Sequence, residues 1–582
     1  MKPLTDYIKA HALKNALEHG KADPSKILPK LFQHGLQKSQ IKDVIPTINK
    51  IIEEINSLSK EEQEQQFKDI QNLIPEKEEK IHDLPELKDT ENLVMRFEPS
   101  PSGPLHIGHA YVLALNHLYV QRYNGKFILR IGDTNPENIY DKAYKLIQED
   151  VNWLTNHIIS EIIIQSDRLP IYYKYFETLL ELDKVYICTC KPKTFKKLIN
   201  NKKSCPCRFL SKEEQKERWR FMFSKYKEGE AVARLKTDIQ DKNPAMRDFP
   251  LFRINETKHP RTKKKFRVWP LMNMAVSIDD LDTKVTHVIR AKDHADNAKR
   301  QEVIHSYLGY ETPNAMFVGR INFLGMPLST TQTRIAIKKK KYKGWDDIRL
   351  PFLLALKRRG YQPEALTKYA KEIGITLTDK TVKKEEFFKA INHFNKEIID
   401  KKANRYFFIK NPKKVKIKRF PIIELDFSSG ISNTSFQKNL TQSGERCIKY
   451  AHPEQTIEIP LHPDDKNRGF RRINVKDEFY IEDKLEKNKN YRFMHLFNFC
   501  NKEFVSHDFD SSLNAKLIHW LPVSKGLVKV KVLMENNKYI SGLAEPDTKK
   551  LKIGDIIQFE RFGFVRLDKK SKSYLEFWWL HK

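Results

Sequence analysis

The stretch EPSPSGPLHIGHA, residues 98–110, joins an apolar, β-prone run to the start of a helical pattern. The run before it, LVMRF at residues 93–97, is short and is followed at once by a cluster of Pro, Ser and Gly residues that must turn. Apolar residues then recur at helical spacing from Ile107 until the Asn-Gly pair at residues 124–125. The sequence therefore predicts a strand, a tight loop and a helix that begins within the His-Ile-Gly-His tetrapeptide of residues 106–109.

A helix start of this kind is a favourable place for a polyphosphate. Free backbone N–H groups and the positive end of the helix attract phosphate oxygens. Imidazole donors at His106 and His109 can follow charge that develops during phosphoryl or adenylyl transfer, and Gly108 lets a flat base or ribose come close. Two histidines three residues apart are, taken alone, more often ordinary surface or core residues. The prediction of a nucleotide site therefore depends on the strand and loop that precede them.

Strand and helix patterns alternate from residue 93 to about residue 333. KFILRI at residues 126–131 and THVIRA at residues 286–291 are two further predicted strands. Such alternation predicts a parallel sheet covered by helices on both faces, which is a Rossmann-type domain. From residue 403 onward, β-prone runs with partial period-two alternation predict a set of β-barrels.

The fold class is therefore multidomain α/β plus β. A charged stretch at residues 60–80 is expected to be a linker or an exposed helix. The expected domains are an N-terminal helical domain at 1–90, the two halves of the catalytic domain at 91–186 and 267–341, an insertion at 187–266, a helical junction at 342–402 and β-barrels at 403–582.

Composition indicates a large protein with a polyanionic partner. The 582 residues are 40% apolar, which is sufficient for several cores, and 106 Lys and Arg against 75 Asp and Glu leave a net charge of +31. Nucleic acid is the first candidate for the partner, and a lysine-rich solvated surface is an equally weighted alternative. Because the chain has no run of eighteen apolar residues and begins with an ordinary amphipathic pattern, we expect no membrane insertion and a cytoplasmic location.

Four of the six cysteines form two close pairs separated by a short segment predicted to be helical. These are Cys188, Cys190, Cys205 and Cys207. Four thiolates can close a tetrahedral structural zinc site, which would organise a lobe that lacks a core of its own. The gap within each pair is one residue rather than the usual two, so reduced structural cysteines are the alternative. Cys447 and Cys500 stand apart and are expected to be buried thiols.

Residues 98–110 resemble the first signature of class I aminoacyl-tRNA synthetases, and the PSPSGP within them resembles the glutamyl and glutaminyl branch. The similarity extends over nearly the whole chain, including ANRYFFI at residues 403–409 and HPDDKNRGFR at residues 462–471, and it is strongest to archaeal-type glutamyl-tRNA synthetases. It implies two-step ligation of glutamate to tRNA(Glu) through glutamyl-adenylate, with ATP and Mg²⁺, a structural Zn²⁺ in the insertion, and a monomer. In that branch tRNA(Gln) is often charged with glutamate as well.

The resemblance also assigns roles to individual residues. His106 and His109 would stabilise the transition state of adenylate formation. The residues implied in ATP binding are Pro101, Gly103, His106, Gly108, His109, Ser329 and Arg334. The residues implied in amino-acid binding are Arg96, Ser100, Asp133 and Arg290. From its position alone, Arg96 could equally be a surface residue at the end of a strand or a residue that binds substrate.

The chain departs from the family pattern at two places. Relatives have an acidic residue just before the Asp-Thr pair, where it holds the substrate ammonium, but this chain has Gly132, so either Asp133 takes over or ammonium recognition is weaker or built differently. The second signature, PLSTTQTR at residues 327–334, lacks the expected lysine, and Arg334 or the lysines at residues 338–341 would have to compensate. The missing acidic residue and the missing lysine would each remove a charge from the site, one that binds the substrate ammonium and one that binds the triphosphate.

Two alternatives follow from these departures and from the shared architecture of the branch. Glutaminyl-tRNA ligation is the first, because the two enzymes have the same layout. A catalytically silent tRNA-binding paralogue is the second, suggested by Gly132 and by the lysine-poor loop. Asp279 and Asp280 are expected to cap a helix or to form salt bridges, and we assign them no catalytic role.

Overall fold

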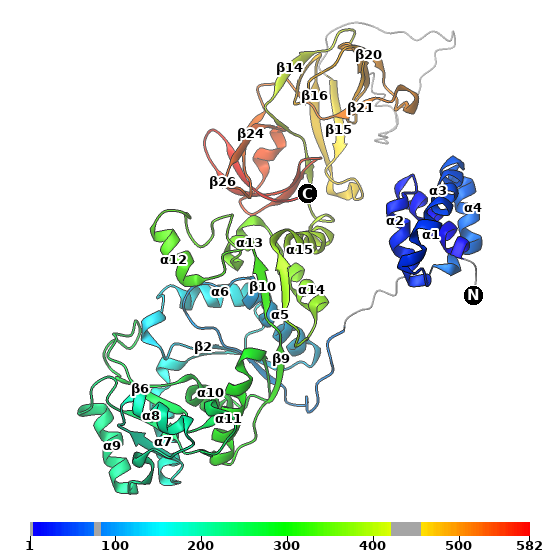
Figure 1. The fold of residues 1–582 in the computed structure, drawn as a ribbon. Coiled ribbons are helices and arrows are strands. Elements are labelled where there is room, and N and C mark those ends of the chain that lie inside the picture. Colours follow the sequence, from blue (N-terminus) through cyan, green and yellow to red (C-terminus); the bar gives the residue numbers. More distant parts are fainter. Residues whose placement is uncertain (1–3, 75–82, 421–454) are drawn as a thin grey trace, which may run out of the picture. The chain divides into compact units, whose positions relative to one another are not determined.

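The computed structural model describes residues 4–74, 83–420 and 455–582 (Figure 1). The chain separates into two compact units, Met1–His82 and Asp83–Lys582.

The first unit is helical, as predicted. Its helices are α1 (Leu4–His19), α2 (Pro24–Leu31), α3 (Ile41–Ser57) and α4 (Lys60–Ile70). Their apolar faces share a core that includes Leu13 and Ile52. The charged stretch begins as α4, where the Ser59 side chain accepts from the backbone N–H of Glu62 and the Glu62 side chain accepts from that of Ser59. The part of this stretch beyond residue 74 lies outside the described residues.

The second unit contains the predicted parallel sheet, with strand order β3-β2-β1-β8-β9. The strands are β1 (Val94–Phe97), β2 (Lys126–Ile131), β3 (Glu161–Ile164), β8 (His287–Ala291) and β9 (Asn314–Val318). All four pairings are parallel, and β1 lies between β2 and β8. The direction of strand order therefore reverses at β1, and ligands of open α/β sheets bind at such a point, beyond the carboxyl ends of the strands.

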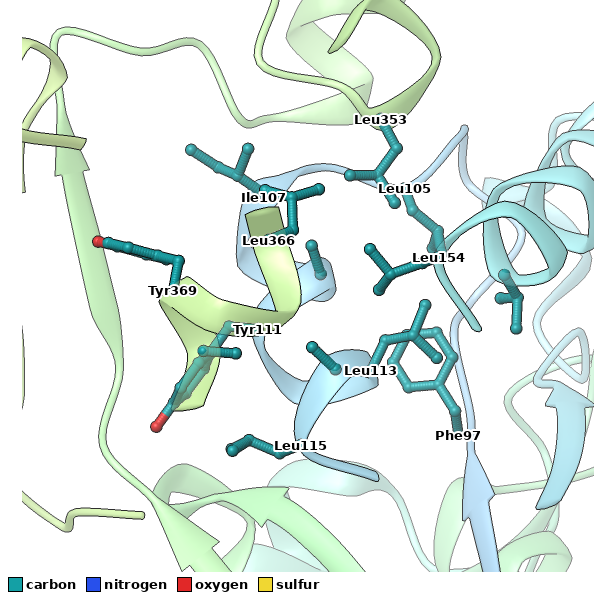
Figure 2. Close-up of a cluster of buried hydrophobic side chains, with 14 of the residues drawn as sticks. Phe97, Leu105, Ile107, Tyr111, Leu113, Leu115, Leu154, Leu353, Leu366 and Tyr369 are labelled. Carbon is teal, nitrogen blue, oxygen red and sulfur yellow. The ribbon is translucent and has the colours of Figure 1, made fainter. Parts of the chain in front are cut away.

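Helix α5 (Ile107–Arg122) is packed between the sheet and α14 (Pro363–Ile373), as Figure 2 shows. Leu113 of α5 is fully buried with Phe97 of β1 and Leu154 of α6 (Ala143–Thr155) in the same core. The hydroxyl of Tyr111 donates to the carbonyl of Gly374 at 2.6 Å. These contacts fix the position of α5 and hence of the histidines at its start.

The predicted insertion, residues 187–266, lies within a lobe built on a separate antiparallel sheet with order β4-β5-β6-β7, and this lobe extends beyond those bounds on both sides. Its strands are β4 (Val185–Cys188), β5 (Val232–Leu235), β6 (Pro250–Ile254) and β7 (Val268–Pro270), and its helices are α7 (Leu169–Glu181), α8 (Pro192–Asn200) and α9 (Lys212–Ser224). Phe176, Trp219 and Phe252 form its aromatic core. Helix α8 is the helical segment predicted between the two cysteine pairs.

Two helices, α10 (Met272–Asp282) and α11 (Ala295–Leu308), return the chain to the parallel sheet, and α12 (Thr330–Lys338) follows β10 (Ile321–Leu324). The predicted helical junction contains α13 (Leu353–Arg359), α14 and α15 (Lys384–Ile399), but also β11 (Lys380–Lys383), which pairs in parallel with β10. The sequence of β11, KTVK, is too short and too charged to signal a strand by pattern, and the pairing with β10 supplies its hydrogen bonds.

The C-terminal part is rich in β-structure, as predicted. Its largest sheet has the order β12-β25-β26-β27-β23-β24-β13. These strands are β12 (Arg405–Tyr406), β13 (Phe408–Lys410), β23 (Val528–Leu533), β24 (Tyr539–Ala544), β25 (Ile556–Phe559), β26 (Gly563–Lys570) and β27 (Leu575–His581). Because the two edge strands, β12 and β13, are separated by one residue, Phe407, the sheet curls back towards itself.

Three smaller sheets complete this part. They consist of β14 (Lys413–Lys416), β17 (Glu478–Ile481) and β22 (Leu521–Pro522); β15 (Gln455–Pro460) and β16 (Phe470–Val475); and β18 (Asn490–Phe493), β19 (Asn498–Cys500), β20 (Glu503–Ser506) and β21 (Lys516–Ile518). Cys500 is half-buried at the end of β19, so the expectation of a buried thiol is wrong there, and Cys447 lies outside the described residues. None of the helices in the described ranges has the length and apolarity needed to cross a bilayer.

Candidate active site

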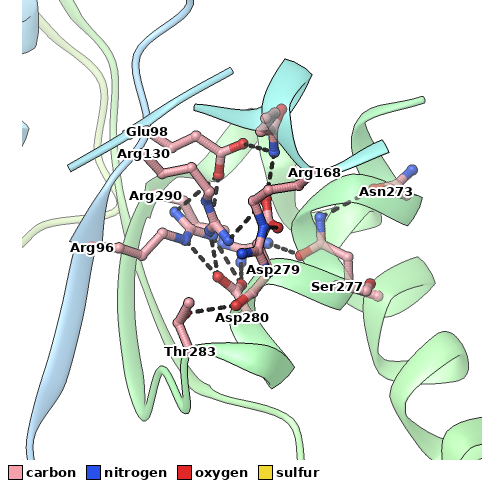
Figure 3. Close-up of polar contacts among 12 residues, drawn as sticks. Arg96, Glu98, Arg130, Arg168, Asn273, Ser277, Asp279, Asp280, Thr283 and Arg290 are labelled. Carbon is pink, nitrogen blue, oxygen red and sulfur yellow. Dashed lines mark hydrogen bonds and ion pairs between the residues drawn. The ribbon is translucent and has the colours of Figure 1, made fainter. Parts of the chain in front are cut away.

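Charged side chains gather where the central strands of the parallel sheet end (Figure 3). Arg96 comes from β1, Arg130 from β2 and Arg290 from β8, while Asp279 and Asp280 come from α10. The three strands are neighbours in the sheet at the point where the strand order reverses. The sheet topology therefore brings together residues that are almost two hundred positions apart in sequence.

Asp280 is the hub of this cluster. The Nε of Arg96 donates to its Oδ1 at 2.8 Å and the Nη2 of Arg96 donates to its Oδ2 at 3.2 Å, and Arg130 also donates to it. Burial opposes ionisation, but the charges of Arg130 and Arg96 hold the pKa of Asp280 well below its usual range. Asp279 accepts from Arg168 at 2.7 Å and from the Tyr172 hydroxyl at 2.9 Å. Both aspartates therefore form salt bridges, one of the two structural roles expected for them.

Arg290 differs from the other arginines of the cluster. Its Nη1 donates to Oε1 of Gln301 at 2.7 Å, while its Nη2 is 3.9 Å from the nearest Asp280 oxygen. Burial and the neighbouring charge of Arg96 lower the pKa of Arg290 to about 10. A guanidinium whose charge is only partly compensated favours an added anion, and its planar fork matches a carboxylate.

His106 and His109 form a reciprocal cap at the start of α5. The Nδ1 of His106 accepts from the backbone N–H groups of Gly108 at 3.1 Å and His109 at 3.4 Å. The Nδ1 of His109 accepts from the backbone N–H of His106 at 3.3 Å. Because each Nδ1 accepts, each neutral ring carries its hydrogen on Nε2 and can donate it.

The two imidazoles are stacked, with ring centroids 3.8 Å apart, and both are half-buried. Burial lowers the pKa of His109 to about 4, and burial together with His109 lowers the pKa of His106 well below its usual range. Both rings are therefore neutral donors at pH 7. Their donors lie at the positive end of α5, where developing negative charge is favoured.

The two predicted signature segments lie against each other. The Ser102 hydroxyl is 3.1 Å from that of Thr330, and a Cβ on Gly103 would lie 3.1 Å from Thr330 Cγ2, so a larger residue at position 103 would require the Thr330 side chain to shift. Ser329 caps α12 by accepting from Gln332 N–H at 3.3 Å. Arg334 is half-exposed one turn further on, and the lysines at residues 338–341 are exposed.

A third segment, which sequence reasoning missed, holds the first signature in place. The backbone N–H of Ile107 donates to the carbonyl of Pro351 at 3.1 Å, and that of Leu353 donates to the carbonyl of Leu105 at 2.9 Å. The Oδ2 of buried Asp150, on α6, accepts from the N–H of Leu105 at 2.9 Å. Each of these contacts is long-range, so no local pattern announces it.

Asp150 gives a testable dependence of stability on pH. Burial raises its pKa from 3.8 to about 7, so the protonated carboxyl contributes stability that is complete below about pH 4 and is lost as the pH rises through about 7. We expect this component to be about 2–4 kcal/mol and to be absent from Asp150→Asn. Chemical denaturation of both proteins between pH 4 and pH 8 measures it, and parallel pH profiles would contradict it.

The remaining predicted residues occupy other positions. Asp133 is buried, with its Oδ2 accepting from the Tyr144 hydroxyl at 2.7 Å and its Oδ1 accepting from the N–H of Ser166 at 2.7 Å. Ser100 is exposed in the loop after β1, and the carbonyl of buried Pro101 accepts from the N–H of Tyr140 at 2.8 Å. Asp133 therefore supports the loop after β2 from beneath rather than facing an open space.

The four clustered cysteines meet in the insertion. Their sulfur atoms all lie within 4.8 Å of one another, with separations of 3.6 Å between Cys188 and Cys205, 3.3 Å between Cys190 and Cys205, and 3.9 Å between Cys190 and Cys207. A tetrahedron with metal–sulfur bonds of about 2.3 Å has sulfur–sulfur edges of about 3.8 Å. The cluster can therefore hold a metal ion.

Comparisons with known proteins agree with this architecture. Residues 92–401 match the family described as tRNA synthetases class I (E and Q), catalytic domain, and residues 403–518 and 517–568 match the corresponding anti-codon binding domains. The chain is 40% identical to glutamate–tRNA ligase of Methanocaldococcus jannaschii over 97% of both chains, and 37% identical to that of Methanobrevibacter smithii over 100% of both. Catalytic and anticodon-binding matches in this order, with relatives aligned along almost all of its length, establish that the chain belongs to the class I tRNA synthetases for glutamate and glutamine.

Proposed function

We propose that this protein ligates glutamate to tRNA(Glu) in two steps. The α-carboxylate of glutamate attacks the α-phosphorus of ATP, giving glutamyl-adenylate and pyrophosphate, and a hydroxyl of the terminal tRNA ribose then takes the glutamyl group and releases AMP. One observation carries this proposal. The neutral histidine donors at the start of α5 and an arginine cluster suited to carboxylates both lie at the carboxyl ends of the central strands of the parallel sheet. The names of the relatives, glutamate–tRNA ligases at 36–40% identity, support it.

In the first step, His106 and His109 donate their Nε2 hydrogens to oxygens of the triphosphate as negative charge accumulates at the α-phosphorus. Gly108, in the first turn of α5, would let the nucleotide come close, and Gly103 lets the loop after β1 pack against Thr330 at the start of α12, next to Ser329. Bound with ATP, Mg²⁺ would neutralise phosphate charge. Among the described residues only the four cysteines gather into a group of three or more metal-binding side chains, so the phosphate oxygens would supply most of its ligands.

In place of the lysine missing from the second signature, positively charged residues nearby would contact the phosphates. Arg334 is the cation within the segment, and the exposed lysines at residues 338–341 follow at the end of α12. Catalysis of this kind depends mainly on positioning and charge stabilisation, so cations at slightly different positions can serve if they reach the departing pyrophosphate.

Arg96 and Arg290 are the proposed ligands of the substrate carboxylates. Arg290 has the less compensated charge, since its nearest carboxylate oxygen is 3.9 Å away. An uncharged glutamine side chain would leave that charge without a partner, which favours glutamate. Ser100 would contribute a hydroxyl from the exposed loop after β1.

The tRNA would be bound by several separate parts of the chain. The net charge of +31 favours a polyanion, the insertion would hold the acceptor end, and the part that matches anticodon-binding domains would read the anticodon. We propose that tRNA(Gln) is charged with glutamate as well and that the protein acts as a monomer in the cytoplasm.

Zinc is the metal that the four thiolates would favour. Cys205 is buried and lies within 3.6 Å of two other sulfur atoms, so Cys205→Ser should reduce bound zinc from one equivalent to well below half and should lower stability by several kcal/mol. Metal analysis of the purified protein measures the zinc content, and thermal denaturation measures the stability. Cys500→Ser, at a half-buried cysteine outside the cluster, is the control and should keep its zinc.

The function is tested by aminoacylation with glutamate or glutamine and with tRNA(Glu) or tRNA(Gln) in all four combinations. The proposal expects glutamate on both tRNAs and no glutamine on either. Charging with glutamine alone would identify a glutaminyl enzyme, and tRNA binding without charging by either amino acid would identify a silent paralogue.

A further inference from the structure

An amino acid that enters this site carries an ammonium group, which needs a carboxylate that the ligand can reach. Asp133 is the residue expected from sequence, but its side chain is 0% exposed and both of its carboxylate oxygens accept hydrogen bonds from within the protein. Asp279 and Asp280, with side-chain exposures of 0% and 1%, are enclosed by arginines. None of these three carboxylates is open to a ligand.

Glu98 is the exception within this cluster. It follows β1 directly, and its side chain is 14% exposed. Its Oε2 is 3.1 Å from Nη2 of Arg130 and 3.6 Å from Nη1 of Arg96, while its Oε1 accepts from Nε2 of Gln165 at 3.3 Å. A carboxylate can accept about four hydrogen bonds, so Oε1 retains capacity for another donor. Figure 3 shows Glu98 at the edge of the network rather than inside it.

Gly132, which follows β2 directly, places no side chain against the Glu98 carboxylate. A Cβ built on Gly132 would lie 3.6 Å from Oε1 of Glu98 and 3.5 Å from Oε1 of Gln165, which is ordinary van der Waals contact. A longer side chain at position 132 would therefore project into the region that the Glu98 carboxylate faces. Of the two residues, Glu98 and Gly132, that lie beside each other after β1 and β2, Glu98 after β1 carries a carboxylate and Gly132 after β2 does not.

The geometry points to Glu98 as the residue that binds the α-ammonium of the amino-acid substrate, with Gly132 leaving room for that group. This inference rests on the proposed activation of glutamate. Glu98 then accepts from the ammonium, while Arg290, 11% exposed on neighbouring β8, faces the side-chain carboxylate of the same molecule. The amino acid is held between one accessible anion and one accessible cation, and the buried pairs beneath them fix their positions.

Equilibrium binding to the full-length protein tests this without turnover, by comparing glutamate with glutarate, which has both carboxylates and no amino group. Glu98→Gln keeps the shape of the side chain and removes its charge. We expect it to weaken glutamate binding about 10- to 100-fold and glutarate binding less than about threefold. An equal change in the binding of both ligands, in either direction, would mean that Glu98 only neutralises or positions Arg96 and Arg130, and it would overturn the inference.

The second part of the test moves the carboxylate from position 98 to position 132. Glu98→Ala should lose the preference for glutamate over glutarate, and adding Gly132→Asp should restore most of it, because the carboxylate returns to the same space from β2. A double variant as indiscriminate as Glu98→Ala would overturn the inference. Glu91→Gln, the same chemical change at an exposed glutamate before β1, is the control. If the unaltered protein binds no glutamate, the proposed function fails; if it binds glutamate but Glu98→Gln leaves the preference unchanged, only this inference fails.

Discussion

Replacing both His106 and His109 by asparagine should lower the rate of glutamyl-adenylate formation by about three to four orders of magnitude. Each neutral imidazole is a preorganised donor at the start of α5, and removal of one such donor costs about 10²- to 10³-fold in rate. Asparagine is itself a good N-cap, so it can replace the cap that His106 makes and limits the effect on folding. Single-turnover formation of glutamyl-adenylate, with tRNA(Glu) present, measures the loss directly.

The histidine experiment needs a control for folding and for histidine loss in general. His393 is an exposed residue on α15 whose ring is 3.2 Å from Glu397, far in sequence from the nucleotide loop, and His393→Asn should leave adenylate formation unchanged. Melting temperatures of the double variant and of the control should agree within a few degrees. Adenylate formation by the double variant at the unaltered rate would contradict the assigned role of the two rings.

Arg290→Met should reduce kcat/KM for glutamate about 10²- to 10³-fold while the KM for ATP changes by less than about threefold. Loss of one partner from a desolvated charge pair costs about 2–5 kcal/mol, and methionine fills a comparable volume without the charge. Pyrophosphate exchange at varied glutamate and varied ATP separates the two effects. A larger effect on the KM for ATP than on that for glutamate would contradict the placement of Arg290 in the amino-acid pocket.

Arg290 is a sharper probe than Arg96, although both belong to the cluster. Removing Arg96 would take away both hydrogen bonds that it makes to buried Asp280 and leave Arg130 as the remaining close cation, and breaking a buried ion pair costs up to about 3–5 kcal/mol of stability. Loss of activity in such a variant would report misfolding as readily as lost binding. Lys368→Met, which breaks an exposed pair with Glu397 between α14 and α15, is the matched control for charge removal and should bind glutamate normally.

The sequence predicts the catalytic sheet well because its signals are local. The strand at residues 126–131 has the predicted bounds, and the strands predicted at 93–97 and 286–291 each begin one residue later. The apolar runs and the turn residues after them are sufficient for this, because each strand ends where its own sequence demands a loop. The two close cysteine pairs on either side of a short helix favour a four-thiolate cluster over separate reduced cysteines, and the four sulfur atoms do lie together.

The site itself depends on contacts that no local pattern records. Pro351 accepts from the N–H of Ile107 across more than two hundred residues, and Asp150 accepts from the N–H of Leu105 from another helix. Asp133 follows its strand as an ammonium ligand should, yet it is buried beneath the loop. No pattern in the sequence selects Glu98 as a ligand of the ammonium group, because only the pairing of β1 with β2 brings Glu98 next to Gly132. Comparing the residues that follow paired strands would have found it.

In the proposed function, the carboxyl ends of the central strands select a second negative charge on the amino-acid substrate. The most direct test is tRNA-dependent pyrophosphate exchange with glutamate and glutamine at equal concentration, each with tRNA(Glu) and tRNA(Gln). The partly compensated charge of Arg290 predicts that glutamate exceeds glutamine by at least about 100-fold with either tRNA. Equal rates for the two amino acids, or a higher rate with glutamine, would contradict the claim.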